Sequence, residues 1–336
     1  MPRVRVAIVG CGDIAITAHL PAIKNSAMVE LVGLVDSKVN VRQELATQWH
    51  VPQAATLEEA LDWQPDAVII ATPPEITPIL GQQALKLGLH VLCEKPMAVD
   101  EKTAEAFHAA AEASGKIVQV GFVNRFAPLI RQAKDWVDAG RLGSPLVFRM
   151  AAFDERLDIN DKTHTERIYH FLEHGPSFVH EAAHHTDYVF NLGGGKPARI
   201  NAMGIRTDPS FPSENYVAAM VEYDNGDVAK FEVGWLFPAL PEGEFIVLGP
   251  NGKIVVSRRN NYATLTDQSG ELRIEAPEDW VSTSFERQLA SFVGSIVTNT
   301  PAAPGTTEGL ASLRLCLDVA KALRSPQRGH ACDSTH

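Results

Sequence analysis

Two histidines and an aspartate at helical spacing, His180, His184 and Asp187, are side chains that can do chemistry together. Spacings of four and three residues place them along one face of a helix, where an imidazole can exchange a proton with a substrate hydroxyl. The same segment reads His-Glu-x-x-His, the pattern in which two histidines bind zinc and the glutamate activates water. A zinc site also needs a third protein ligand and water access. We therefore expect no metal here and keep zinc hydrolysis as an alternative.

A glycine-rich turn at residues 10–15 follows an apolar run and reads Gly-x-Gly-x-x-Ala before a helical stretch. Gly10 permits the tight turn, Gly12 lets the backbone approach a pyrophosphate, and the small Ala15 allows close packing of helix against sheet. The free N–H groups at the start of a helix favour negative charge, so the turn predicts a dinucleotide phosphate site. The expected contacts in the turn are Gly10, Gly12, Asp13 and Ile14.

Asp36 stands at the end of the second apolar run. A carboxylate at this position can accept hydrogen bonds from both ribose hydroxyls of an adenosine. It also repels the 2′-phosphate of NADP, whereas the nearby Lys38 would attract that phosphate. We therefore predict NAD as the cofactor, with NADP possible, and include Ser37 among the contacts.

The triplet Glu94-Lys95-Pro96 follows the fourth predicted strand. The carboxyl ends of strands in an open parallel sheet face the ligand crevice, which places Lys95 beside the nicotinamide. A lysine there can hydrogen-bond the hydroxyl being oxidised, and partial burial would lower its pKa. The alternative is a solvated charge at the start of a loop.

Several segments carry a resemblance that covers nearly the whole chain. They are the turn at residues 10–15, Ala71-Thr72-Pro73, Glu94-Lys95-Pro96, Asn124-Arg125-Phe126, and the stretch from Gly175 through Asp187. Together they make the sequence similar to the glucose-fructose oxidoreductase/inositol dehydrogenase/rhizopine-catabolism (Gfo/Idh/MocA) family of nicotinamide-dependent oxidoreductases. The resemblance implies an N-terminal dinucleotide-binding domain and a C-terminal open, mainly antiparallel sheet. It also implies that carbohydrates or polyols are oxidised or reduced in the cleft between the two.

The resemblance assigns His184 to the family's base position, acting on the hydroxyl that Lys95 polarises. At the position of His180 the family usually carries an aspartate. The sequence therefore does not show which group orients the His184 ring or balances its charge. Asp187 is the nearest acidic substitute in sequence, and His180 is a candidate to hydrogen-bond a substrate hydroxyl. The expected cofactor contacts beyond the turn and Asp36 are Thr72, Pro73, Glu94, Lys95, Asn124 and Arg125.

The elements that must position these residues form two parts. Up to Gly121, short runs rich in valine and isoleucine alternate with helical stretches, which predicts a Rossmann-type doubly wound parallel sheet in an α/β domain. Beyond it come strands with hairpin signals such as Asp224-Asn225-Gly226, a helix from Ser177 to Leu192, and a polar cluster at 164–170 that we expect in a loop. We predict a NAD(P)-binding domain at 1–121, an α+β substrate-binding and oligomerisation domain with an open, mainly antiparallel sheet at 122–325, and a flexible tail at 326–336.

Composition restricts the partners of the chain. Its 336 residues include 30 basic and 41 acidic side chains, a formal net charge of -11, which disfavours nucleic acid and anionic membrane surfaces. The four cysteines are far apart without a Cys-x-x-Cys, and no apolar run reaches membrane-spanning length, so we expect a cytoplasmic protein. Trp235 and Phe237 alternate on a strand with no helix to cover it, which predicts a homodimer or homotetramer formed through the open sheet.

These features predict an NAD(P)-dependent dehydrogenase or reductase that acts on CH–OH groups of sugars, sugar derivatives or cyclic polyols. His184 would take the hydroxyl proton while the carbinol hydride passes to the nicotinamide. The alternatives are NAD-assisted glycoside cleavage, a nucleotide-binding sensor without turnover, and the zinc hydrolase.

Overall fold

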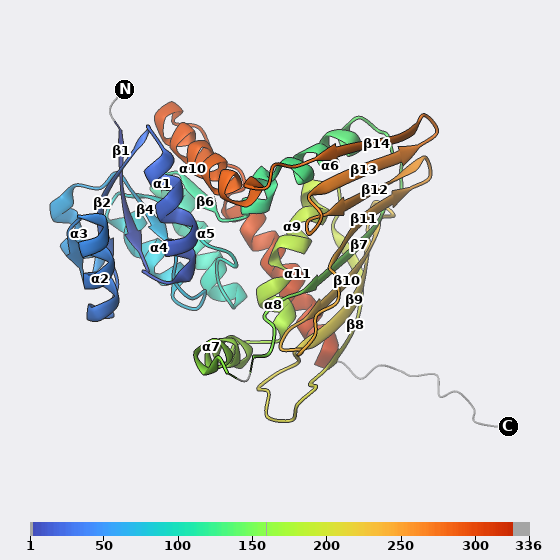
Figure 1. The fold of residues 1–336 in the computed structure, drawn as a ribbon, viewed down its shortest axis with the longest axis horizontal. Coiled ribbons are helices and arrows are strands. Elements are labelled where there is room, and N and C mark those ends of the chain that lie inside the picture. The colour runs from blue at the N-terminus through green and yellow to red at the C-terminus, as the bar shows by residue number, and fades with distance from the viewer. Residues whose placement is uncertain (1–2, 159, 325–336) are drawn as a thin grey trace.

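The computed structural model describes residues 3–158 and 160–324. The predicted tail at 326–336 lies outside this part of the chain. Two sheets stand apart, with helices packed around the first and between the two (Figure 1). Within the described residues, every helix is too short or too polar to span a bilayer.

The first sheet is parallel throughout, in the strand order β3-β2-β1-β4-β5-β6. Its central strands are rich in valine and isoleucine and are buried, as expected for a sheet that helices cover on both faces. This arrangement confirms the predicted Rossmann-type fold. The strands are β1 (Val4–Val9), β2 (Val29–Val35), β3 (Gln53–Ala54), β4 (Ala67–Ile70), β5 (His90–Cys93) and β6 (Val118–Val120).

Local sequence signals set the ends of the helices that join these strands. The Thr56 side chain caps α3 by accepting from the backbone N–H of Glu59, and Asp100 caps α5 by accepting from that of Thr103. Gly115 ends α5 in the left-handed conformation, with φ 65°. The helical segments here are η1 (Ala15–His19, a π-helix), α1 (Leu20–Asn25), α2 (Val39–Trp49), α3 (Leu57–Ala60), η2 (Leu61–Trp63), α4 (Thr77–Lys86), α5 (Glu101–Ser114) and η3 (Val123–Phe126).

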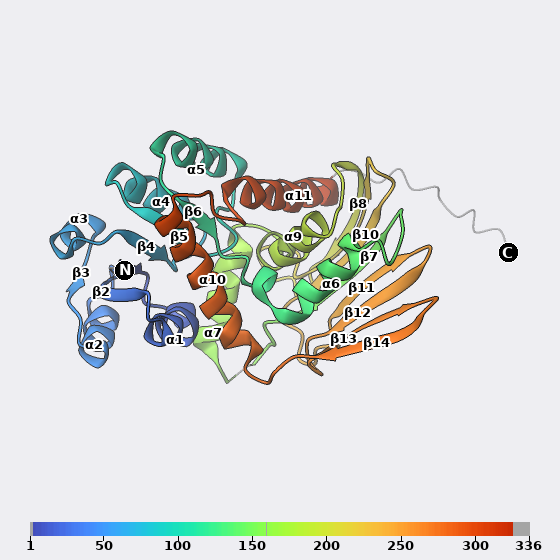
Figure 2. The same cartoon turned by 90° about the horizontal axis from the view of Figure 1, so that it is seen from above.

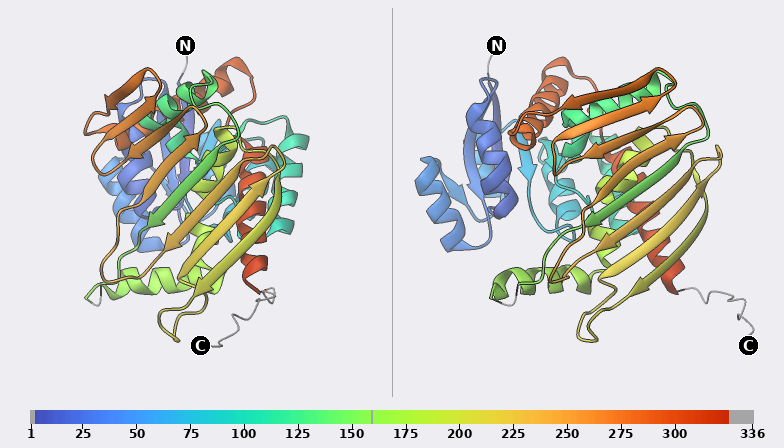
Figure 3. Two further views of the ribbon diagram at one scale, coloured as in Figure 1. Left: turned by 90° about the vertical axis from the view of Figure 1, so that its right-hand side faces the viewer. Right: turned by 45° about the vertical axis from the view of Figure 1, so that its right-hand side comes forward.

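The second sheet has the strand order β14-β13-β12-β11-β7-β10-β9-β8, and its neighbouring strands are antiparallel except for β10 with β7. One face shares an apolar core with α6 (Pro128–Asp138), α8 (Ser177–Glu181) and α9 (Ala183–Asn191). No helix of the described residues covers the opposite face (Figure 3). The strands are β7 (Val147–Phe153), β8 (Pro197–Ile205), β9 (Tyr216–Tyr223), β10 (Val228–Gly234), β11 (Glu244–Gly249), β12 (Gly252–Ser257), β13 (Tyr262–Asp267) and β14 (Gly270–Glu275).

Two long helices return from the second sheet to the first. The helix α10 (Trp280–Thr298) places Phe285, Leu289 and Phe292 in the same apolar core as β1. The helix α11 (Thr306–Arg324) lies between the two sheets and contacts α5, α9 and β8 (Figure 2). The end of the chain therefore completes the core around the first sheet.

The polar cluster at 164–170 lies in a helix rather than in the expected loop. This helix, α7 (Lys162–Glu173), begins where the Asp161 carboxylate accepts from the backbone N–H of His164. Ile168 and Leu172 face a small apolar core under it, four residues apart on one side of the helix. The polar residues occupy the other side and obscured this pattern in the sequence.

Two further differences lie close to the predicted site. The expected helix from Ser177 to Leu192 is divided at Ala182 into α8 and α9. Trp235, expected on the open face of the sheet, is 3% exposed. It follows the alternation of β10, in which Ala229, Phe231 and Val233 are buried on the helix-covered face, so the next odd position also lies on that face and not on the open one.

Candidate active site

The glycine-rich turn leaves β1 at the carboxyl edge of the first sheet. Gly10 has φ 93°, and a Cβ there would come within 2.4 Å of the Ala71 carbonyl oxygen, so the position requires glycine. A Cβ on Gly12 would meet nothing within 4 Å, which leaves open space where a pyrophosphate can approach the backbone. Asp13 is exposed and Ile14 is half-buried at the start of the helix that follows. The turn therefore fits a dinucleotide.

Asp36 follows β2 directly and is held beside this turn by two backbone N–H groups. Its Oδ2 accepts from Cys11 and its Oδ1 from Lys38, each at 2.8 Å. Each carboxylate oxygen keeps a lone pair for a ribose hydroxyl, and the side chain is only half-buried. Arg42, which the sequence reading passed over, donates to the backbone carbonyls of Asp36 and Ser37 and fixes the path of this loop.

Other predicted contacts gather at the same edge of the sheet. Thr72 and Pro73 follow β4, and Glu94 and Lys95 follow β5, its neighbour. The Lys95-Pro96 peptide bond is cis. Lys95 is half-buried, and its ammonium forms no ion pair with any residue that the structure describes. Its charge is therefore free to act on a ligand.

A buried pair that the sequence reading missed links the first helical segment to the Glu-Lys-Pro triplet. His19 Nε2 lies 2.9 Å from Glu94 Oε1, and His19 is 3% exposed. His19 ends the π-helical segment η1, whose wider turn sets the direction of its side chain. The pair fixes the residue that precedes Lys95. A histidine among the apolar residues of that segment is the signal that could have revealed it.

The helices α8 and α9 bring His180 and His184 toward Lys95. Burial lowers the pKa of His180 to about 4, and the Lys95 charge acts in the same direction. Burial also lowers the pKa of His184 well below its ordinary value, helped by Lys95 and Arg258. Both imidazoles are therefore neutral at pH 7 and able to accept a proton or a hydrogen bond. Within the described residues, Nε2 of His180 and Nδ1 of His184 are buried without a hydrogen-bond partner.

His180 packs against aromatic rings, whereas an aspartate at this position would need polar contacts. Its ring stacks on Trp235 with centroids 5.8 Å apart and an interplanar angle of 26°. Phe171 of α7 lies 5.5 Å from it on centroids. The rings leave the unpaired Nε2 as the polar atom that His180 can offer to a ligand.

Asp187 is paired with Arg125 rather than with His184. The Arg125 guanidinium donates from Nε to Oδ2 at 2.8 Å and from Nη2 to Oδ1 at 2.6 Å. Asp187 is 1% exposed; burial raises its pKa to about 6, and Arg125 opposes this rise. Within the described residues no hydrogen bond joins Asp187 to His184. The pair instead ties η3, with the buried Asn124, to α9.

A cavity of about 460 Å³ opens on the second sheet, lined from the helical side by Glu181, His185 and Tyr188. The Arg258 guanidinium on its wall lies 5.4 Å from the centroid of the Trp280 ring and forms no ion pair within the described residues. Its charge adds to burial in lowering the pKa of both His184 and His185. The sequence reading missed Arg258 because it follows β12, far along the chain. Glu244 also lines the cavity.

The two histidines of the His-Glu-x-x-His pattern are not grouped with a third ligand within the described residues. His180 and His184 belong to two helical segments that meet at Ala182. Within the described residues, the metal-ligand atoms that group in threes within 4.8 Å belong to Glu75, His170 and His174, a set that excludes both histidines of the pattern. The geometry gives zinc hydrolysis at this pattern no support.

Comparison with known proteins agrees with this arrangement. Residues 4–122 match the family model described as "Oxidoreductase family, NAD-binding Rossmann fold", and residues 130–255 match the GFO/IDH/MocA C-terminal domain. The chain belongs to the Gfo/Idh/MocA oxidoreductase family. Its first sheet is accordingly an NAD-binding Rossmann domain, as predicted.

Two curated Gfo/Idh/MocA relatives align with much of the chain. It is 30% identical over 233 residues to 1-carboxy-3-chloro-3,4-dihydroxycyclohexa-1,5-diene dehydrogenase of Comamonas testosteroni, covering 67% of this chain and 56% of that protein. It is 25% identical over 211 residues to scyllo-inositol 2-dehydrogenase (NAD(+)) of Bacillus subtilis, covering 61% of this chain and 59% of that protein. The match thus spans just over half the length of each relative.

The fold extends over the whole of a solved neighbour. Myo-inositol 2-dehydrogenase from Lactobacillus plantarum superposes with a TM-score of 0.82 at 20% identity, covering 96% of this chain and 97% of that chain. Both sheets and their connection are therefore shared with that structure.

Proposed function

We propose that the protein is an NAD-dependent dehydrogenase that oxidises a secondary hydroxyl of a sugar, sugar derivative or cyclic polyol, or reduces the corresponding carbonyl. The observation that carries the proposal is an unpaired Lys95 ammonium whose charge acts on two neutral imidazoles, the buried His180 and the half-buried His184, at the ligand-facing edge of the NAD-binding sheet. The inositol dehydrogenase relative supports the substrate class.

The chain supplies both the cofactor cradle and the proton acceptor. Gly12 and Asp36 would hold the pyrophosphate and the adenosine ribose, and the bound nicotinamide would supply the hydride acceptor. Lys95 donates a hydrogen bond to the substrate hydroxyl and stabilises negative charge on its oxygen. His184 accepts the hydroxyl proton at Nε2, since its Nδ1 is enclosed by the protein. His180 offers Nε2 to a neighbouring hydroxyl.

The test is the formation of NADH, followed by its absorbance, across a panel of inositols, aldoses and sugar acids. We expect turnover with at least one class and none for Lys95→Ala with the same substrate. NAD binding without turnover on any compound would favour the sensor instead. Cleavage of a nitrophenyl glycoside that depends on NAD would favour glycoside cleavage.

Arg258 favours a substrate that carries an acidic group. It is a cation beside His184 without an acidic partner among the described residues, and the site has a histidine, His180, where the family carries an aspartate. The histidine removes repulsion toward an anion, and Arg258 adds attraction for one. On the same cavity wall Glu242 and Glu244 are paired with Arg259 and Arg149, which leaves Asp154 and Glu181 as the acidic side chains that oppose this attraction. The Comamonas relative, whose name includes a carboxyl group, supports this preference.

The acid preference is tested with matched pairs such as glucose and glucuronate. We expect Arg258→Met to lower kcat/KM for the acid at least about tenfold, the loss of one charge-assisted hydrogen bond, and to leave the neutral partner unchanged. Arg273 is the control because its guanidinium is paired with Glu275 and lies outside the cavity lining, so Arg273→Met should affect neither. Equal losses in both arginine variants would contradict the assignment.

We also propose a homodimer or homotetramer formed through the uncovered face of the second sheet. Met203, Ile205 and Met220 lie there on β8 and β9 and are 67%, 56% and 45% exposed, in place of the predicted Trp235. A second copy of the chain would cover this apolar strip. Light scattering should return a multiple of the monomer mass, reduced to the monomer in Met203→Lys. A monomeric wild type at micromolar concentration would rule the assembly out.

We retain a cytoplasmic location as part of the proposal. Cys11, Cys93 and Cys316 are buried free thiols, which suits a reducing compartment. Fractionation of the native host would test it, and recovery of the protein outside the cytoplasm would contradict it.

A further inference from the structure

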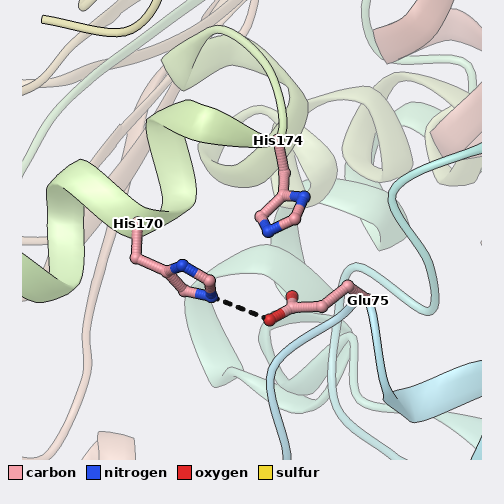
Figure 4. A group of neighbouring side chains, drawn as sticks. All are labelled: Glu75, His170 and His174. Carbon is pink, nitrogen blue, oxygen red and sulfur yellow. Dashed lines mark hydrogen bonds and ion pairs between the residues drawn. The ribbon is translucent and has the colours of Figure 1, made fainter.

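The last turn of α7 contacts the loop after β4. His170 lies in this turn, His174 is the residue that directly follows the helix, and both point to the same side as Glu75, which follows β4 (Figure 4). One ligand atom from each of the three side chains lies within 4.8 Å of the others. The group therefore joins the substrate side of the molecule to the cofactor side.

Some ligand atoms of the group have no hydrogen-bond partner among the described residues. The Glu75 Oε2 atom is buried without a hydrogen-bond partner among the described residues. His174 contacts the edge of the His170 ring, with centroids 5.0 Å apart, and forms no hydrogen bond within those residues. His170 Nε2 lies 3.0 Å from Glu75 Oε1. That contact joins two members of the group, and Glu75 Oε2 and the His174 ring remain without a hydrogen bond among the described residues.

A carboxylate behind one imidazole is a further sign of a built site. His170 Nδ1 lies 3.4 Å from Oε2 of Glu173, three residues along the same helix. Histidines that bind metals generally donate their second ring N–H to a carboxylate or carbonyl, which orients the ring toward the ion. His170 has this partner on the side away from Glu75.

We propose that Glu75, His170 and His174 bind a divalent transition-metal ion, such as Zn²⁺, that joins α7 to the loop after β4. Two imidazoles and a carboxylate suit such ions, which coordinate nitrogen and oxygen at about 2.0–2.2 Å. Closing the group around an ion needs only side-chain rotation, since both histidines are exposed. A fourth position is left for water.

The position of the ion has a consequence for the cofactor cleft. Arg167, one turn earlier on α7, forms an ion pair with Asp13 in the glycine-rich turn. The helix thus reaches the NAD-binding domain at two points, Asp13 and Glu75, both of which follow strands at its ligand-facing edge. An ion at the second point would hold α7 over this edge and slow the release of a bound dinucleotide.

The test is ion binding by purified full-length protein after dialysis against a chelator. Titration with Co²⁺, followed by its visible absorption, and with Zn²⁺, followed by calorimetry, should give one ion per chain. His174→Ala and Glu75→Gln should weaken binding at least about 100-fold, and Glu173→Gln by about tenfold, the range for an orienting partner. Far-UV circular dichroism checks that each variant is folded.

The matched control is His164→Ala, a histidine of the same helix that lies outside the group and should leave binding unchanged. A second control, His180→Ala, tests the His-Glu-x-x-His segment and should also retain the ion. Loss of the ion in His180→Ala but not in His174→Ala would overturn the proposal. Absence of ion uptake by the wild type at micromolar concentrations would overturn it too, and would leave the group as an interdomain hydrogen bond.

A second readout follows the cofactor. Release of NADH from the wild type, measured by stopped-flow fluorescence, should slow when Zn²⁺ is added, whereas release from His174→Ala should not respond. These measurements need no substrate and no turnover. A failure of the dehydrogenase proposal would therefore leave the metal site untouched, and the reverse also holds.

Discussion

The two sheets of this molecule position functional groups in different ways. On the first, Gly12, Asp36 and Lys95 each lie in the loop that begins at the end of a strand, so the order of strands alone places them at one edge. On the second, His180 meets Trp235 and Asp187 meets Arg125, partners that lie on separate elements far apart in the chain. The cofactor side thus depends on local sequence rules, and the substrate side depends on long-range packing.

The largest expected effect is a loss of turnover on removing His184 from the substrate side. His184→Ala should lower turnover by about two to four orders of magnitude because a positioned proton acceptor is lost, while NAD affinity stays unchanged. Steady-state kinetics and a fluorescence titration of the cofactor measure the two quantities. Glu181→Gln is the control and should matter much less. The opposite pattern, with activity lost in Glu181→Gln but kept in His184→Ala, would restore the zinc hydrolase.

Breaking the Arg125–Asp187 pair should test long-range packing itself. The Arg125 side chain is 14% exposed, and Asp187→Ala would leave its guanidinium without a partner. We therefore expect a loss of about 3–5 kcal/mol in the free energy of unfolding. Glu244→Ala removes the partner of Arg149 in a pair that is 41% and 37% exposed, where about 1 kcal/mol or less is expected. Urea unfolding compares the two. Similar losses in both variants would contradict the distinction.

Acid should destabilise the substrate side through its neutral histidines. The pKa of His180 falls from 6.5 to about 4 in the folded state, so the unfolded chain binds this proton first as the pH drops. Stability is therefore full above pH 6.5 and is lost between pH 6.5 and about 4, by up to about 3 kcal/mol for this group. Unfolding measured along this pH range should show the fall, reduced in His180→Gln and unchanged in His50→Asn, an exposed control. An identical slope in His180→Gln would exclude His180 as its source.

The smallest expected effect is a loss of NAD affinity on replacing Asp36 on the cofactor side. Asp36→Ser should weaken NAD binding by about 1.5–3 kcal/mol, because the ribose hydroxyls lose a charged acceptor, and should narrow the preference over NADP. Titration of both dinucleotides against both proteins measures this. Tighter binding of NADP than of NAD by the wild type would show that Asp36 does not select the cofactor.

The fold of the cofactor side could be predicted because its signals are short in range. The glycine-rich turn, the Thr56 and Asp100 caps and the buried strands each depend on residues within one or two turns. The predicted contacts at the strand ends gather at one edge for the same reason. His19 was missed because its partner, Glu94, is close only after the sheet has formed.

The substrate side could be predicted only in part. His180 and His184 were found through their spacing and a family resemblance, but the stack of His180 on Trp235 depends on which face of the second sheet the helices cover. Arg258 carries no local pattern that separates it from any exposed arginine. Residues 164–170 were expected in a loop because the apolar side of α7 is narrow, and its partners lie on distant segments.

The return of α10 to the first sheet determines when that sheet can finish folding during synthesis. Phe285, Leu289 and Phe292 leave the ribosome after both sheets have been made, yet they belong to the core around β1. Until then the nascent NAD-binding half presents a bare apolar surface, which is where chaperones bind and where aggregation starts. A fragment that ends before α10 would keep this surface permanently. The two halves are thus distinct as architecture but form a single unit for expression and engineering.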